Sequence, residues 1–302
     1  MNRIELVCIV GGGYLGSQIG LLCAKNGYTV RIQDISLSAL NNSKKSISGY
    51  LDEFEETKEI KKNERADIRK RISYHNDLEE AVSRATIIIE AVSEDLELKK
   101  KLFKQIDMLC PPNVLVASNS SSIRISKIEV VMNHPERALN MHFYSYPWRR
   151  RIVELMKGQS TNDQVFNIAK SFCQKIGVNP LIVLKESTGF IFNRVWRAIK
   201  KECLNVIEEG VASFEDVDRA WMSLYNTDTG PFGLMDRVGL DVVRDIELVY
   251  YEESGDPSDA PPSVLLKKIK KGELGVKTGK GFYSYPNPQY KEKGWLYKQS
   301  DT

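Results

Sequence analysis

Short apolar runs alternate with amphipathic stretches through the first 186 residues of the chain. Because helix-like segments separate most of these runs, the pattern predicts strands that alternate with helices. This alternation is typical of an α/β fold with a doubly wound, largely parallel sheet. The predicted strands are Leu6–Val10, Thr29–Ile32, Thr86–Ala91, Val114–Ala117, Ala138–His142, Ile152–Leu155 and Leu181–Leu184.

A long charged segment interrupts this alternation between residues 38 and 71. Its central part reads Ser-Gly-Tyr-Leu-Asp-Glu-Phe-Glu-Glu-Thr-Lys-Glu-Ile-Lys-Lys, where a simple fold needs a single helix. We interpret the segment as a helical arm, formed as a hairpin, that projects from the domain. A solvated charged face with no role in ligand binding explains the same residues equally well.

The pattern changes after Glu186, where helical periodicity replaces the strands. Apolar residues recur at helical spacing between Gly189 and Gly210, and Ser213-Phe-Glu-Asp has the N-cap and early acids of a helix start. We therefore expect an α/β domain with the doubly wound sheet over residues 1-186 and a smaller all-α domain over residues 187-302. The amphipathic helices of the second domain suit the interface of a homodimer. The tail from Pro286, rich in Pro, Lys and Tyr, is expected to be extended or loose.

Composition and charge argue against several classes of protein. A chain of 302 residues is long enough for two domains, and its net charge of +3 is too small to suggest a nucleic-acid partner. We find no apolar run long enough to cross a membrane and no secretory signal. The five cysteines are scattered without metal or redox spacing, so we expect no metal site and a reducing, cytoplasmic environment.

The first predicted strand runs into a glycine-rich loop that is typical of dinucleotide binding. Gly11 permits the tight turn, Gly13 lets the backbone approach a pyrophosphate, and Gly16 lets the following helix pack on the strand. The pyrophosphate would lie at the N-terminus of that helix. Tyr14 and Leu15, inside the same loop, are further candidate cofactor contacts.

Asp34 closes the second predicted strand, where a carboxylate can accept hydrogen bonds from the adenosine ribose. No Arg or Lys follows it to bind a 2′-phosphate, so NAD is the expected cofactor rather than NADP. The alternative is a glycine-rich turn in which Asp34 only helps Ser36 to cap the next helix.

The chain has three histidines, and one of them lies where such a sheet binds ligands. His142 ends an apolar strand and can act as a base near neutral pH. His75 and His134 lie in polar, loop-like contexts and are expected to be solvated. Glu154 ends the next apolar run, where it can orient the His142 imidazole. A satisfied core histidine beside an unrelated acid fits the same pattern.

A hydroxyl-rich loop, Ser118-Asn-Ser-Ser-Ser-Ile123, follows another strand end at the same edge. Its side chains suit hydrogen bonds to a nicotinamide and a substrate. The same residues fit a helix cap equally well, since serine is a common N-cap.

Taken together, the motifs resemble the 3-hydroxyacyl-CoA dehydrogenase family in order and spacing, over nearly the whole chain. The resemblance implies a Rossmann-type domain, a helical dimerisation domain, and an NAD-dependent interconversion of 3-hydroxy and 3-oxo groups on a short-chain acyl-CoA. The motifs that carry it are the glycine loop, the serine-rich loop, His142 with Glu154, Gly189-Phe-Ile-Phe-Asn193-Arg, Gly230-Pro-Phe-Gly-Leu-Met-Asp236 and Gly279-Lys-Gly-Phe-Tyr283.

The resemblance also implies roles for individual residues. His142 matches the family's catalytic base, and Glu154 matches the acid that orients it. Ser121 and Asn193 match residues that hold the substrate in the active site. The cofactor contacts implied in the same way are Glu94, Lys99, Ser121, Ser145 and Lys277.

The segment after the candidate base departs from the family pattern. The family commonly has His-Phe-Phe-Asn-Pro, whereas this chain reads His142-Phe-Tyr-Ser145-Tyr-Pro147, with serine in place of an asparagine that contacts the cofactor. Trp148-Arg-Arg-Arg151 follows. Arg149 and Arg150 can clamp a substrate carboxylate or phosphate, and they fit plain surface charge equally well.

A second departure concerns the group to which the acyl chain of the substrate is attached. The acidic stretch Leu51-Asp-Glu-Phe-Glu-Glu56 stands where relatives that handle CoA tend to carry lysines, although Lys58, Lys61 and Lys62 follow it. The Asp-Leu-Glu-Leu-Lys-Lys-Lys stretch from residue 95 also resembles lambda-crystallin-type L-gulonate dehydrogenases, which use no CoA. The alternatives are therefore a dehydrogenase of a free or carrier-bound 3-hydroxy acid, and a non-catalytic NAD-binding structural protein.

Overall fold

The computed structural model describes residues 5–297. Its contacts divide the chain into two compact units, one that ends at Ile191 and one that begins at Phe192. The sequence places this boundary slightly earlier, after residue 186.

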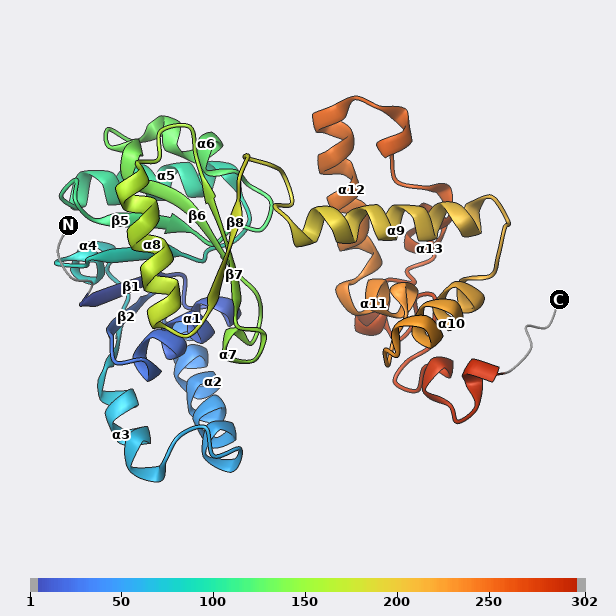
Figure 1. The fold of residues 1–302 in the computed structure, drawn as a ribbon, viewed down its shortest axis with the longest axis horizontal. Helices are drawn as coiled ribbons and strands as arrows, with labels where there is room; N and C mark the ends of the chain where they lie inside the picture. The colour runs from blue at the N-terminus through green and yellow to red at the C-terminus, as the bar shows by residue number, and fades with distance from the viewer. Residues whose placement is uncertain (1–4, 298–302) are drawn as a thin grey trace. The chain divides into compact units, whose positions relative to one another are not determined.

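An eight-stranded sheet organises the first unit (Figure 1). Neighbouring strands are parallel except for β6 and β7, which run antiparallel. The chain crosses from one half of the sheet to the other between β3 and β4, as in doubly wound folds, so the predicted fold class is confirmed. In spatial order the strands are β3 (Ile72–His75), β2 (Thr29–Gln33), β1 (Leu6–Val10), β4 (Ile87–Glu90), β5 (Leu115–Ser118), β6 (Ala138–Phe143), β7 (Ile152–Lys157) and β8 (Asn179–Val183).

Side chains of the central strands alternate between two cores. Val7 and Ile9 of β1 face one core, and Cys8 and Val10 face the other. Because both faces are buried, such strands read as continuous apolar runs, which is why the sequence reveals them clearly. The first core includes residues of α1 (Tyr14–Lys25) and α8 (Asp163–Lys175), and the second includes residues of α4 (Leu78–Val82), α5 (Leu96–Leu109) and α6 (Ile125–Ile128).

The charged segment forms two helices, α2 (Leu37–Glu56) and α3 (Lys62–Lys70), which both pack against α1 (Figure 1). Ser36 caps α2, because its Oγ accepts the Ala39 N–H at 3.2 Å. The helical arm is therefore confirmed. Its inner face is not simply solvated, because Leu40, Ile47, Leu51 and Phe54 are buried in the first core.

The expectation of a solvated loop around His75 is wrong. Residues Ile72–His75 form the edge strand β3, and His75 pairs with Gln33 of β2. Its side chain is 15% exposed, and its Nδ1 lies 3.2 Å from Glu80 Oε1. The strand escaped detection because it is short, lies at the edge of the sheet and contains only half-buried or exposed residues.

Helices form the second unit, as predicted. Their shared core contains Leu204, Phe232, Leu240 and Tyr283. None of the helices in the described part of the chain combines the length and apolar character needed to cross a bilayer. The helices are α9 (Phe192–Glu208), α10 (Phe214–Tyr225), α11 (Pro231–Val238), α12 (Leu240–Ser254) and α13 (Ser263–Lys270).

The expectation of a loose tail is wrong for its described part, residues 286–297. Tyr290 and Trp295 are only 5% and 3% exposed, and both belong to the core of the second unit. Composition misled the prediction, since aromatic side chains in a Pro- and Lys-rich segment still bury large apolar surfaces. Residues 298–302 of the tail lie outside the described residues.

The motifs Gly230-Pro-Phe-Gly-Leu-Met-Asp236 and Gly279-Lys-Gly-Phe-Tyr283 both take part in the packing of the second unit. Asp218 accepts the N–H groups of Phe232 and Gly233 at the start of α11, together with the Tyr283 hydroxyl. Burial raises the pKa of Asp218 to about 6, although these donors stabilise its charge. A Cβ on Gly281 would lie 2.0 Å from Asp236 Oδ1, so the glycine is required for this close approach.

Candidate active site

The carboxyl ends of five parallel strands bring most of the predicted site segments to one edge of the sheet. In spatial order, β2 ends near Asp34, β1 leads into the glycine loop, β4 leads to Glu94, β5 leads to the serine-rich loop, and β6 carries His142. Neighbouring strands are about 4.8 Å apart, so the four steps from β2 to β6 span roughly 19 Å. The topology thus arranges the predicted cofactor and substrate residues along one extended path.

The glycine loop has the geometry that a pyrophosphate needs. A Cβ on Gly16 would lie 1.9 Å from the carbonyl oxygen of Gly11, and Gly11 itself has a φ of +109°. By contrast, nothing lies within 4 Å of a Cβ on Gly13, which is the position expected to face a ligand. Helix α1 has no side-chain cap, so its first N–H groups remain for an anion.

Asp34 lines a cavity of about 850 Å³ beside the glycine loop. Its Oδ2 accepts the Gly12 N–H and its Oδ1 accepts the Ser36 N–H, each at 2.9 Å. The helix-cap role and the ribose role are therefore compatible, because each carboxylate oxygen has a further lone pair. The other lining residues include Gly11, Gly13, Ile35, Asp77, Glu79, Leu98 and Met108.

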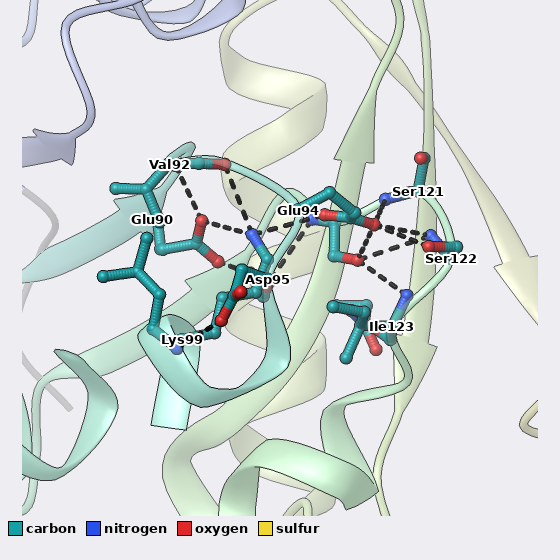
Figure 2. A network of polar contacts seen from close by, with 12 residues as sticks. Glu90, Val92, Glu94, Asp95, Lys99, Ser121, Ser122 and Ile123 are labelled. Carbon is teal, nitrogen blue, oxygen red and sulfur yellow. Dashed lines mark hydrogen bonds and ion pairs between the residues drawn. The ribbon is translucent and has the colours of Figure 1, made fainter. Parts of the chain in front are cut away.

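A buried ion pair supports the next segment of the edge (Figure 2). Lys99 is 1% exposed, and its Nζ lies 2.6 Å from Glu90 Oε1 and 3.4 Å from Glu94 Oε2. Asp95 caps α5 and places Lys99 one turn into the helix, facing β4. The lysine that the sequence assigned to cofactor contact is thus enclosed by two carboxylates.

Glu94 organises the serine-rich loop (Figure 2). Its Oε1 accepts the hydroxyls of Ser120 and Ser122 at 2.5 and 2.8 Å and the N–H groups of Ser121 and Ser122 at 3.2 and 3.0 Å. Ser121 contributes its backbone N–H to this network. Among the described residues, its hydroxyl has no hydrogen-bond partner in the network.

The two carboxyls of this network differ in their electrostatics. Burial raises the pKa of Glu90 above its usual value, although Lys99 and Ser118 stabilise its charge. Burial also opposes ionisation of Glu94, but Lys99 and the loop serines outweigh it and lower the pKa of that carboxyl. Glu94 therefore stays ionised and holds the loop through charge-assisted hydrogen bonds.

His142 and Glu154 form the pair that the sequence predicted. The antiparallel register of β6 and β7 places the two residues directly opposite each other, which puts both side chains on one face of the sheet. Nδ1 of His142 lies 2.8 Å from Glu154 Oε2. With its proton on Nδ1, the imidazole keeps a basic lone pair on Nε2.

The surroundings of this pair are largely apolar and aromatic. Glu154 is fully buried, and its Oε1 accepts the Ile191 N–H at 2.9 Å. The imidazole lies 5.4 Å from the ring of Phe190 and 4.6 Å from the ring of Tyr144. A carboxylate without water around it interacts more strongly with an imidazolium than it would in solution.

The arginines after β6 belong partly to the arm. Arg149 is exposed, and its guanidinium lies 2.5 Å from Glu53 of α2. The adjacent acids Asp52 and Glu55 lie 2.5 and 3.3 Å from Arg65 of α3. The acidic stretch of the arm is thus balanced by arginines within the first unit. Arg150 is exposed and Ser145 is half-buried.

Two predicted site residues belong to the second unit. Asn193 lies in the first turn of α9 and is half-buried. Lys277 lies 2.5 Å from Asp241 through its Nζ, and its side chain is 46% exposed. Their roles stay predictions, as do those of the other site residues.

Sequence reasoning missed three residues that support the site. Glu90 holds Lys99, Oδ1 of Asn119 accepts the Phe143 N–H, and Asn140 bonds the backbone of Ile123 and Ile125. Glu90 carried a usable signal, because it ends the apolar run Ile87-Ile-Ile-Glu90 just as Asp34 ends its own strand. Asn119 was quoted only as part of the serine-rich loop.

The comparisons with known proteins agree with this geometry. The model of the NAD-binding domain of 3-hydroxyacyl-CoA dehydrogenase matches residues 6–187, and that of the C-terminal domain matches residues 189–285. A probable 3-hydroxybutyryl-CoA dehydrogenase of Bacillus subtilis is 33% identical over 283 residues, which cover 94% of this chain and 98% of the relative.

Solved structures are similar over the same length. An (S)-3-hydroxybutyryl-CoA dehydrogenase from Ralstonia eutropha has a TM-score of 0.90 at 33% identity, over 94% of this chain and 100% of that chain. A diketoreductase that acts on dicarbonyl compounds has a TM-score of 0.81 at 31% identity, over 94% and 100%.

A Rossmann-type sheet that carries a glycine loop and a candidate base along one edge defines the class of NAD-dependent oxidoreductases. Within that class, the chain belongs to the 3-hydroxyacyl-CoA dehydrogenase family. The resemblance inferred from the sequence motifs is therefore confirmed.

Proposed function

We propose that this protein interconverts a short-chain 3-hydroxyacyl-CoA and its 3-oxoacyl-CoA with NAD. The observation that carries the proposal is the 2.8 Å contact between His142 and Glu154 on the same sheet edge as the glycine loop. An imidazole oriented by a buried carboxylate is suited to exchange a proton with a hydroxyl or carbonyl group.

The roles of the chain's own residues follow from their chemistry. His142 accepts the proton of the C3 hydroxyl at Nε2, and Glu154 stabilises the imidazolium that results. Ser121 and Asn193 supply hydrogen bonds to the substrate. When bound, the cofactor accepts the hydride, while the protein provides orientation and electrostatics.

The substrate assay decides between the two candidate substrate classes. We expect the purified protein to oxidise NADH with acetoacetyl-CoA and to turn over free acetoacetate and gulonate poorly. The pairing of the arm acids with Arg65 and Arg149 supports this choice, because it reduces the repulsion that a CoA phosphate would meet. A rate confined to the free acids would overturn the CoA proposal.

A dehydrogenase of a free or carrier-bound 3-hydroxy acid is the second candidate. The exposed Arg150 and the likeness to a diketoreductase favour it. In that case Arg149 and Arg150 bind the anionic end of the substrate.

We also propose that the cofactor is NAD rather than NADP. Asp77 and Glu79 line the same cavity as Asp34, so three carboxyl groups oppose a 2′-phosphate. The Asp34→Ala variant is expected to raise the dissociation constant of NADH about tenfold or more, since hydrogen bonds to a charged group are lost.

Fluorescence titration of NADH measures this effect, with Glu79→Gln as a control in the same cavity. Asp34 also bonds the backbone of Gly12 and Ser36, so the melting temperature of each variant is measured alongside. A dissociation constant that does not change in Asp34→Ala refutes the ribose contact.

The assembly and location of the protein are proposals as well. We propose a homodimer formed through the second unit, whose helices α9 and α12 expose Phe192, Val195, Val242 and Val249. The mass of the protein in solution distinguishes this dimer from a monomer. A cytoplasmic location is supported by the five cysteines, which are all buried as free thiols.

A further inference from the structure

Gln18 is a fully buried polar side chain of α1, and the proposed reaction assigns it no role. It is 0% exposed, and it belongs to the helix that begins directly after the glycine loop. Burial of an amide costs free energy unless its donors and acceptor find hydrogen-bond partners. The partners of Gln18 come from the arm and from the segment that follows the candidate base.

Both halves of the Gln18 amide are hydrogen-bonded. Its Oε1 accepts the Tyr146 N–H at 2.6 Å, and its Nε2 donates to the Tyr50 hydroxyl at 3.0 Å. A reversed amide would place its NH2 group against the Tyr146 N–H, which is also a donor, so the two contacts fix the orientation of the side chain. Gln18 thereby joins α1 to the arm helix α2 and to residue 146, which lie 32 and 128 positions away in the chain.

Tyr146 has a backbone conformation that depends on support from its surroundings. Its φ of +54° and ψ of +58° lie in the left-handed region, which is unfavourable for a residue with a Cβ. Gln18 pairs its N–H, and its carbonyl oxygen accepts the N–H groups of Arg149 and Arg150 in the short helix α7 (Pro147–Arg150). Proline, which the family pattern commonly has at this position, has no N–H and could not make the bond to Gln18.

Aromatic contacts hold the ring of Tyr146 against the same helix. Its centroid lies 6.3 Å from that of Tyr14 and 6.1 Å from that of Tyr50, with interplanar angles of 82° and 83°. Edge-to-face contacts of this kind are favourable. Tyr14 is the first residue of α1 and lies one helical turn before Gln18. Helix α1 therefore contacts both the backbone and the ring of Tyr146.

The residue before Tyr146 is Ser145, a predicted cofactor contact. Ser145 follows β6 and the glycine loop follows β1, and the strands β4 and β5 lie between them in the sheet. We propose that Gln18 is a positioning residue that holds Tyr146, and through it Ser145, at a fixed place relative to the glycine loop. The inference rests on the proposed function, in which both segments contact the cofactor, and it deepens that function by naming the side chain that connects them.

Hydrogen exchange of the cofactor-free protein tests the contact directly. In Gln18→Met, the Tyr146 amide should exchange about fivefold faster than in the wild type, because methionine has a similar length but accepts hydrogen bonds only weakly. Mass spectrometry with single-residue fragmentation measures this amide. Gln174→Met, on the exposed face of α8, is the matched control and should leave the exchange of Tyr146 unchanged.

The wild-type protein gives a test that needs no variant. If the Tyr146 amide exchanges as fast as in an unstructured peptide, Gln18 does not hold it, and the proposal is overturned. Faster exchange throughout the first unit of Gln18→Met, rather than at residues 144–146, indicates a purely structural role and also overturns the proposal. If Gln18→Met fails to fold, as judged by its melting curve, Gln18→Leu is measured in the same way.

Kinetics test whether the contact matters to the reaction. With the best substrate of the assay above, Gln18→Met should lower kcat about tenfold and change the dissociation constant of NADH less than about threefold, because Asp34 and the glycine loop are retained. In a Ser145→Ala background, the same substitution should lower kcat much less. An unchanged kcat in the single variant, or an equal loss in both backgrounds, overturns the proposal.

Failure of this proposal is distinguishable from failure of the proposed function. A wild-type protein with no turnover of any 3-hydroxy or 3-oxo substrate rejects the proposed function. The exchange rate of the Tyr146 amide is measured without substrate or cofactor, so it still decides whether Gln18 holds this segment.

Discussion

Replacing His142 by glutamine is expected to lower turnover at least about a hundredfold, because the proton acceptor at the sheet edge is lost. Glutamine is close in size to histidine and can still donate a hydrogen bond to Glu154, so the local packing should survive. The binding of NADH should be unchanged, since the glycine loop and Asp34 belong to other strands. Steady-state rates and a fluorescence titration of NADH measure the two quantities.

The control for this experiment is His134→Gln, because His134 is the histidine with the more exposed side chain of the two outside the pair, at 43%. Its rate should match that of the wild type. If His142→Gln retains full turnover, His142 is not the base, and the proposed chemistry must use another group.

The second large effect concerns stability. Replacing Lys99 by methionine is expected to lower the free energy of unfolding at neutral pH by about 3–5 kcal/mol, because Glu90 would remain buried without its partner. Denaturant unfolding followed by circular dichroism measures this loss. Lys100→Met is the matched control, since Lys100 pairs with Glu97 near the surface and should contribute less than about 1 kcal/mol.

The loss caused by Lys99→Met should also depend on pH. Burial already raises the pKa of Glu90, and removal of the ammonium leaves that effect unopposed by Lys99. Because the pKa of Glu90 is then higher in the folded variant than in the unfolded chain, the folded state binds the proton more readily. The free energy of unfolding of the variant therefore falls as pH rises from the unfolded pKa of the carboxyl to its folded pKa. The deficit relative to the wild type should therefore shrink as pH is lowered from neutral. A deficit that is independent of pH would contradict the buried-carboxylate explanation.

The Lys99→Met variant also tests whether Lys99 affects cofactor binding directly or through its neighbours. The ammonium lies against Glu90 and Glu94 and is 1% exposed, so its predicted role at the cofactor would run through Glu94 and the serine-rich loop. Glu94 holds that loop through its Oε1, which accepts from Ser120, Ser121 and Ser122. If Lys99→Met weakens cofactor binding, we expect the cause to be a serine-rich loop that Glu94 positions less firmly.

Sequence patterns predicted elements well where burial is two-sided. The strands of the central sheet lie between two cores, so almost every residue in them is apolar, and their ends are easily recognised. The sequence did not predict the strand β3, because this strand lies at the edge of the sheet. It also did not predict the burial of the aromatic tail, because the composition of the tail resembles that of a loop. In both places the burial depends on segments far away in the chain.

The chain's sequence determined its fold class, its glycine loop, its strand-end acid and the identity of the candidate base, because these depend on local spacing and residue type. Only the tertiary structure decided which groups meet. The register of β6 and β7 brings Glu154 to His142, and the helix α5 buries Lys99 between two carboxylates. The physical reason is that contact between side chains depends on register and packing, which residues distant in sequence determine together.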